Sequence, residues 1–160
     1  MSDVDQGSFR QATGQFAGGI VVVTTSADHA MTVSAFMSVS LEPPLVLFGA
    51  EKIARFHDAV LAAGAWAVSI LAEDAEKTAR WLATPGRPLD GVAHHPGPVT
   101  GAPLLDGALA TLECQTAAVH DGGDHSIIVG RVVAVTSAEG LPSRGPLMHY
   151  AGSYRRLRPS

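Results

Sequence analysis

The clearest pattern along the chain is an alternation of apolar and polar positions in residues 31–41, MTVSAFMSVSL. The odd positions are apolar, and the even positions carry hydroxyl groups and one aromatic ring: Thr32, Ser34, Phe36, Ser38 and Ser40. Successive side chains of a strand point to opposite faces, so one extended segment would place all five on one face. The pattern predicts a strand with a hydroxyl-rich face, ended by Glu42-Pro43-Pro44.

Other apolar runs predict further strands. Residues 20–25 and 45–48 are almost wholly apolar, which is typical of strands buried in a core. Residues 66–71 alternate large and small side chains, as in a half-buried strand. The runs 108–119 and 126–137 flank a polar, glycine-containing segment and predict a hairpin, and a last short strand is expected at 147–150.

Three segments have helical spacing instead. Ser8 is expected to cap a first helix that carries Phe9 and Phe16 on one side and ends at Gly18-Gly19. A second helix is predicted over 53–63, with Gly64 as a left-handed C-cap, and a third over 73–83. Residues 85–107 hold half of the ten prolines in the sequence and predict an irregular loop.

The connections favour an antiparallel fold, because most links between predicted strands are too short for parallel crossovers. We therefore predict a mainly β protein of six or seven strands and three short helices, with a closed antiparallel sheet. A length of 160 residues fits a single domain over 1–160.

Composition and charge narrow the functional classes. Hydrophobic residues make up 46% and charged residues 16%, which indicates a compact globule rather than a disordered chain. A net charge of -4 provides no overall attraction to nucleic acid or an anionic membrane. The single cysteine, Cys114, forms no internal disulfide, and no signal sequence or spanning segment is evident, so we expect a soluble, cytoplasmic protein.

The hydroxyl-rich face has two interpretations. A solvated outer face is one, but such faces usually carry Lys, Glu or Arg, and no charge occurs between Met31 and Leu41. The uncharged face suits a ligand with many polar edges, such as a flavin. At the predicted hairpin, His125 is either a turn residue or a group that holds a carboxamide or phosphate, and Asp124 either orients its ring or stabilises the turn.

Several other chemistries lack their sequence signals. The histidines show neither helical i, i+4 spacing nor paired cysteines, so no metal site is expected. The sequence has no G-x-G-x-x-G or Walker loop and no nucleophile elbow. Arg131, the one charge inside an apolar strand, is interpreted as a rim residue rather than a ligand contact.

Taken in order, the motifs resemble the small flavin reductases, which are the reductase components of two-component flavin-dependent monooxygenases built on the FMN-binding split barrel. The resemblance covers nearly the whole chain. It is carried by FR at 9–10, FAGG at 16–19, VVVTT at 21–25, MTVSAFMSVSLEPPLV at 31–46, LLDGALATLEC at 104–114, GDHSIIVGRV at 123–132 and PLMHYAGSYRRL at 146–157.

This resemblance implies a homodimer with FMN or FAD in a groove at the subunit interface. The segment Thr32–Ser40 would cradle the flavin, and the segment Ala50–Phe56 would face its phosphate and ribityl chain. The implied flavin residues are Thr32, Val33, Ser34, Ala35, Ser38, Val39, Ser40, Ala50, Glu51, Lys52, Arg55 and Phe56. His125 is implied to contact NADH or NADPH, with Tyr150 or Tyr154 beside it.

The chain departs from the family pattern at three places. Relatives usually have a hydroxyl-rich stretch where this chain has Ile53-Ala54-Arg55-Phe56, so phosphate contacts there depend on Lys52, Arg55 or backbone groups, and the choice between FMN and FAD stays open. Arg87-Pro88-Leu89-Asp90 replaces the usual Arg-Phe before Gly91-Val92, and His149 replaces a common tyrosine.

The implied reaction is hydride transfer from the nicotinamide to N5 of the flavin, which needs no catalytic residue because both reactive atoms belong to cofactors. Reduced flavin would then supply a partner monooxygenase. Two alternatives remain: a flavin-binding carrier or sensor without reductase activity, and a β-barrel interaction domain without a cofactor. The sequence leaves open whether flavin is a prosthetic group or a substrate.

Overall fold

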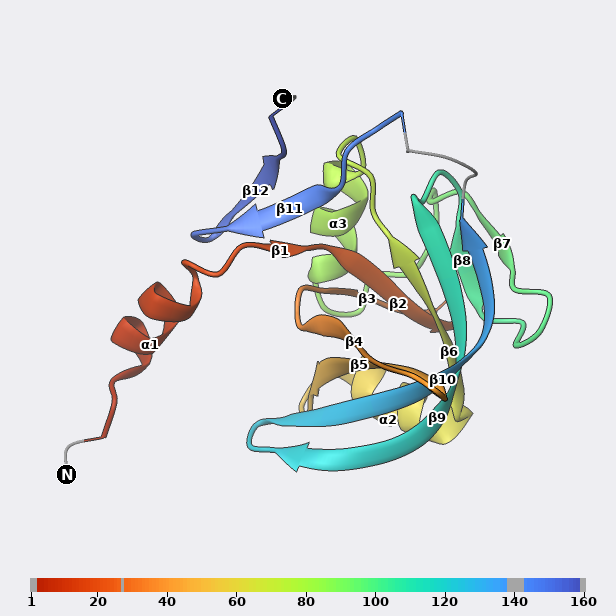
Figure 1. Ribbon diagram of the computed structural model, residues 1–160, viewed down its shortest axis with the longest axis horizontal. Coiled ribbons are helices and arrows are strands. Elements are labelled where there is room, and N and C mark those ends of the chain that lie inside the picture. The colour runs from red at the N-terminus through yellow and green to blue at the C-terminus, as the bar shows by residue number, and fades with distance from the viewer. Residues whose placement is uncertain (1–2, 27, 138–142, 159–160) are drawn as a thin grey trace.

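A curved antiparallel sheet forms the body of the protein in the computed structural model, which describes residues 3–26, 28–137 and 143–158 (Figure 1). In sheet order its seven strands are β3 (His29–Val33), β2 (Val21–Ser26), β6 (Ala65–Ile70), β9 (Ala110–Gly122), β10 (His125–Ser137), β5 (Pro44–Glu51) and β4 (Phe36–Leu41).

Smaller elements surround this sheet. A three-stranded sheet contains β1 (Gly18–Gly19), β11 (Leu147–Tyr150) and β12 (Ser153–Arg156), and β7 (His94–Pro96) pairs with β8 (Pro103–Leu105). The helices are α1 (Gln6–Thr13), α2 (Arg55–Ala63) and α3 (Glu76–Ala83). Figure 1 shows α1 projecting away from the body, and none of its residues is buried. No helix in the described ranges has the length and apolar character needed to cross a membrane.

The sheet curls because its two edge strands follow one another in the chain. Strand β3 ends at Val33 and β4 begins at Phe36, although the two strands lie at opposite edges of the sheet. In a flat seven-stranded sheet these edges would be about 29 Å apart, at about 4.8 Å for each of the strand spacings. The link from Val33 to Phe36 reaches about 11 Å at most. The edges must therefore approach each other, which gives the barrel.

Each side of the sheet has its own core, covered by its own helix. Inside the barrel, Phe48 meets the ring of Trp66 edge-on, with ring centroids 4.8 Å apart, and α2 contributes Phe56 and Val60. On the other side α3 packs through Ala79 and Leu82. These two clusters fix α2 and α3 against the sheet.

The main predictions of the sequence are confirmed. The fold is mainly β and antiparallel, and the described residues form three helices. Helix α2 ends at Gly64, whose φ of 66° is left-handed. The predicted hairpin is formed by β9 and β10, and Gly123 in its turn also has a positive φ.

The prediction of one hydroxyl-rich strand over 31–41 is wrong. The chain bends at Ser34-Ala35, and a register irregularity follows between Ser38 and Ser40. Before the bend, Val33 is buried; after it, Met37 is exposed, so the odd positions change from the core to the surface. The polar face is divided because the link carries the chain from one sheet edge to the other.

Several smaller predictions are also corrected. The N-cap of α1 is Asp5, whose carboxylate accepts from the backbone of Gly7 and Ser8, so Ser8 lies within the helix. Helix α1 ends at Thr13, and Gly18–Gly19 form β1. Strand β6 is buried rather than half-buried, because α2 and β8 pack against it. Strand β12 was not expected.

The predicted loop at 85–107 contains β7 and β8, and a buried carboxylate holds it in place. Glu113 is only 2% exposed. It accepts hydrogen bonds from the backbone N–H groups of Val99 (3.1 Å) and Thr100 (2.7 Å) and from the Thr100 hydroxyl (2.8 Å). These long-range bonds satisfy a buried charge and order a segment whose local sequence is rich in turn residues.

We expect Gly130→Ala to lower the free energy of unfolding by about 2 kcal/mol, because the added Cβ overpacks the core. That Cβ would overlap the Trp66 ring, 2.7 Å from Cη2, and lie 3.1 Å from Cβ of Cys114. Gly19→Ala is the matched control, since nothing lies within 4 Å of its added Cβ. Urea unfolding measures both, and equal losses in the two variants would contradict the packing argument.

Candidate cofactor-binding cleft

A cleft of about 440 Å³ lies where β3 approaches the ends of β5 and β10. This volume falls within the range of small-molecule sites. The lining is formed by Asp28–Ala35, Gly49, Glu51, Ile53–Phe56, Leu82–Arg87 and His125. Closure of the sheet brings these distant segments together.

Small residues form the part of the cleft nearest His125. The N–H of Gly49 donates to the carbonyl of Ala35 at 3.0 Å, so the edge-to-edge link is bonded to β5 at this point. A Cβ on Gly49 would lie 3.4 Å from Cβ of Ala35 and 3.6 Å from Cδ2 of His125. The missing side chain keeps this part of the cleft wall low, which allows a ligand to approach the backbone closely.

Two arginines also line the cleft, together with the carboxylates of Asp28 and Glu51. Arg55, the first residue of α2, and Arg87, beyond the end of α3, both line it. Neither takes part in an ion pair among the described residues. The guanidinium of Arg87 lies over the Trp81 ring, 4.3 Å from its centroid. Ala54 gives α2 no side-chain cap, so the positive end of this helix adds to the attraction for an anion.

His125 is oriented by its neighbour in the sequence. Its Nδ1 lies 2.7 Å from Oδ1 of Asp124. An ionised carboxylate only accepts hydrogen bonds, so Nδ1 donates this one and Nε2 is the ring nitrogen available to a ligand. The hydrogen bond and charge of His125 lower the pKa of the Asp124 carboxyl from its usual 3.8.

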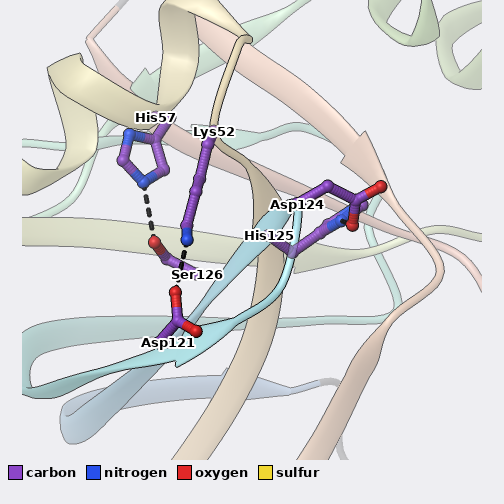
Figure 2. A network of polar contacts seen from close by, with 6 residues as sticks. All are labelled: Lys52, His57, Asp121, Asp124, His125 and Ser126. Carbon is purple, nitrogen blue, oxygen red and sulfur yellow. Dashed lines mark hydrogen bonds and ion pairs between the residues drawn. The ribbon is translucent and has the colours of Figure 1, made fainter.

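Figure 2 shows further contacts between the hairpin tip and residues 52–57. The ammonium of Lys52 pairs with Asp121 on β9, and the backbone N–H of Lys52 donates to the carbonyl of Asp124 at 2.9 Å. The bond from Lys52 lowers the pKa of the Asp121 carboxyl. On α2, Nε2 of His57 lies 2.8 Å from the hydroxyl of Ser126. The tip is therefore attached to the segment that leads into α2.

The structure brings together about half of the residues predicted for cofactor binding. Those that line the cleft are Thr32, Val33, Ser34, Ala35, Glu51, Arg55, Phe56 and His125. Of these, Thr32 already donates its hydroxyl to the carbonyl of Ala79 at 2.7 Å, so it anchors β3 to α3. Their roles toward a cofactor stay predictions.

The other predicted residues lie outside this lining. Ser38, Val39 and Ser40 are on β4, beyond the bend, and Ala50 is buried in the core. Lys52 is directed to Asp121. Tyr150 donates to Oε1 of Gln15 at 3.0 Å, and Tyr154 packs between Arg80 and His149.

Gly49 and Leu82–Gly86 line the cleft but were given no role from the sequence. No functional role was predicted for Arg87 either, because the family motif is altered at that position. The available signals were the glycine at 49 within an otherwise apolar strand, and the helix stop Thr84-Pro85-Gly86. Neither signal shows that these residues face β3, because the distance between them is closed only by the barrel.

Comparisons with known proteins agree with this arrangement. Residues 13–158 match the family model described as "Flavin reductase like domain". The chain is 40% identical over 159 residues to the NADH-dependent flavin reductase of a Rhodococcus species, covering 92% of this chain and 84% of the relative. It is also 40% identical over 153 residues to the reductase component of 4-hydroxyphenylacetate 3-monooxygenase from Thermus thermophilus, covering 94% and 95%.

A solved structure extends the similarity to three dimensions. The NADH:FAD oxidoreductase SgcE6 of Streptomyces globisporus, in complex with NAD and FAD fragments, superposes with a TM-score of 0.90 at 37% identity. The alignment covers 99% of this chain and 98% of that chain.

In a carboxyl NMR titration we expect Asp124 to titrate below 3.8 and to return toward that value in His125→Phe. The depressed pKa means that the contact stabilises the hairpin tip at pH values above about 4, and that this stabilisation is lost as pH falls through the lowered pKa. Asp121 is the internal control, because its partner Lys52 is unchanged. An unaltered Asp124 in the variant would show that His125 does not set its pKa.

Proposed function

This chain belongs to the flavin reductase like domain family, and we propose that it is an NADH-dependent flavin reductase that acts on FMN or FAD. When bound, the two cofactors supply the redox chemistry, in which a hydride passes from the reduced nicotinamide to N5 of the flavin. The protein contributes binding, orientation and electrostatics.

One observation carries the proposal: small residues, two arginines and an oriented histidine border the same cleft. The open surface at Ala35 and Gly49 accepts the flat flavin ring. Arg55 and Arg87 hold the phosphate-bearing part of the flavin, since guanidinium groups pair well with phosphate oxygens. The nicotinamide cofactor would be held beside His125, whose Nε2 could hydrogen-bond to its carboxamide.

The same cleft explains why the reaction needs no acid, base or nucleophile from the chain. Backbone groups at the bend and the hydroxyl of Ser34 would hold the polar edge of the flavin. Donors fixed in advance stabilise the negative charge that gathers there, because they need no reorganisation during the reaction. Holding the two rings about 3 to 3.5 Å apart supplies the remaining acceleration.

We assign reduced flavin as the product that leaves the protein and reaches a monooxygenase. Support comes from the Thermus thermophilus relative, which is named as the reductase component of a monooxygenase.

The test is to titrate the purified protein with FMN and FAD, then to follow NADH oxidation at saturating flavin. Turnover is expected for the parent protein, and His125→Ala should raise KM for NADH by about 10-fold while the flavin Kd stays within about 2-fold, since only the nicotinamide contact is lost. His120→Ala, on the exposed side of the same hairpin, is the control. Flavin binding without NADH oxidation would instead identify a flavin carrier or sensor.

The protein is also proposed to be a homodimer. Helix α1 buries none of its residues, and Phe16 is 87% exposed. On β4, Met37, Val39 and Leu41 have exposed side chains, with Leu41 at 90%. Apolar surfaces of this extent usually mark an interface. Within one chain, the hydroxyls of Ser38 and Ser40 on β4 lie outside the cleft lining. In a dimer they could contact a cofactor bound by the partner protomer.

Sedimentation velocity tests the dimer. The parent protein is expected at twice the mass of one chain, and Phe16→Asp is expected to shift it to the monomer, because a buried unpaired carboxylate opposes association. Val135→Asp is the matched control, since Val135 is also an exposed apolar residue but lies on β10 rather than on β4 or in the segment between α1 and β1 that holds Phe16. A parent protein that sediments as a monomer would overturn the proposal.

A further inference from the structure

A buried hydrogen bond joins two walls of the cleft from behind. His57 lies on α2 immediately after Phe56, which lines the cleft, and Ser126 lies on β10 immediately after His125. Their side chains meet, with His57 Nε2 and Ser126 Oγ 2.8 Å apart, and both are largely shielded from solvent. Neighbouring strand residues face opposite ways, and Figure 2 shows His125 and Ser126 pointing to different sides.

The contacts of His57 also include Asp58, with Nδ1 and Oδ1 3.1 Å apart. A serine, histidine and aspartate in this order resemble a hydrolytic triad. However, Ser126 is buried and does not line the cleft, and the Asp58 side chain is 91% exposed. A nucleophile must reach its substrate, so this constellation suits a fixed structural connection rather than hydrolysis.

Beyond the ladder in which Glu51 pairs with His125, three contacts join residues 52–57 to the hairpin tip, and this one is buried. The other two are the ion pair of Lys52 with Asp121 and the backbone bond from Lys52 to Asp124, both at the exposed tip. Exposed ion pairs contribute little, whereas a buried hydrogen bond is costly to leave unmade. The bond between His57 and Ser126 is therefore the contact best placed to fix β10 relative to α2.

We propose that His57 is a positioning residue for hydride transfer, acting through Ser126 on the separation of His125 from the cleft wall at Arg55 and Phe56. This inference rests on the proposed function, in which the flavin lies against that wall and the nicotinamide against His125. A misplacement of about 1 Å can reduce the rate about 100-fold, so a bond that fixes both walls controls the rate more than the affinity.

The experiment compares His57→Leu, which removes the bond, with His57→Gln, whose terminal amide can bond to the Ser126 hydroxyl through its oxygen or its nitrogen. Single-turnover hydride transfer is expected to slow at least about 10-fold in His57→Leu and to recover to within about 3-fold of the parent in His57→Gln. The flavin Kd should change less than about 3-fold, and the charge-transfer absorbance of the complex with NADH should weaken only in His57→Leu.

A second readout needs no cofactor. In the cofactor-free protein, amide hydrogen exchange should become faster in both 51–57 and 121–126 in His57→Leu, and in neither segment in His57→Gln. His95→Leu is the matched control, because His95 also pairs with an aspartate, Asp106, at 2.6 Å, but lies on β7 outside the cleft lining. It should change neither the rate nor exchange in the two segments.

The inference is overturned if hydride transfer in His57→Leu equals that of the parent, or if His57→Gln is as slow as His57→Leu. A general rise in exchange across all strands would likewise reduce the role of His57 to global stability. If His57→Leu does not fold, Ser126→Ala removes the same bond from β10, and Ser126→Thr keeps a hydroxyl. A parent protein that never oxidises NADH would refute the proposed function, whereas the exchange measurement would still test the connection.

Discussion

The short link from Val33 to Phe36 is the constraint on which the other features depend. It joins the two edges of the sheet, so the sheet has to curl until those edges meet. Curling brings β3 beside the end of β5, and the carbonyl of Ala35 then receives the N–H of Gly49. The space where a flavin can lie exists because of this closure, and it is bordered by segments that are otherwise far apart in the chain.

Much of the fold could be predicted from the sequence, because local signals specify it. Buried strands such as β2 are continuous apolar runs, and Gly64 marks the end of α2 by its left-handed conformation. The bend at Ser34-Ala35 has no such signal, since it contains neither glycine nor proline. The alternation of apolar and polar residues also continues through it. The odd-numbered side chains change from the core to the surface after the bend because the sheet closes, and closure is a property of the whole sheet.

The candidate site was predictable where a motif fixes the backbone and less so where a side chain chooses its partner. The position of His125 at the candidate site was predicted from the hairpin and from the family resemblance. Lys52 was expected beside a phosphate, yet its ammonium pairs with the carboxylate of Asp121, which is 69 positions away in the sequence. The contact of His57 with Ser126 spans the same separation. Pairings of this kind depend on register between strands, which no local pattern reveals.

The order of strands in the sheet also bears on how the chain is made. Strands β2 and β5 emerge early during synthesis, but β6, β9 and β10 lie between them in the sheet. The barrel therefore cannot close on the ribosome until residues up to Ser137 have left the exit tunnel. Sheets dominated by distant pairings fold slowly, so the nascent chain keeps apolar surface accessible at least until β10 has emerged.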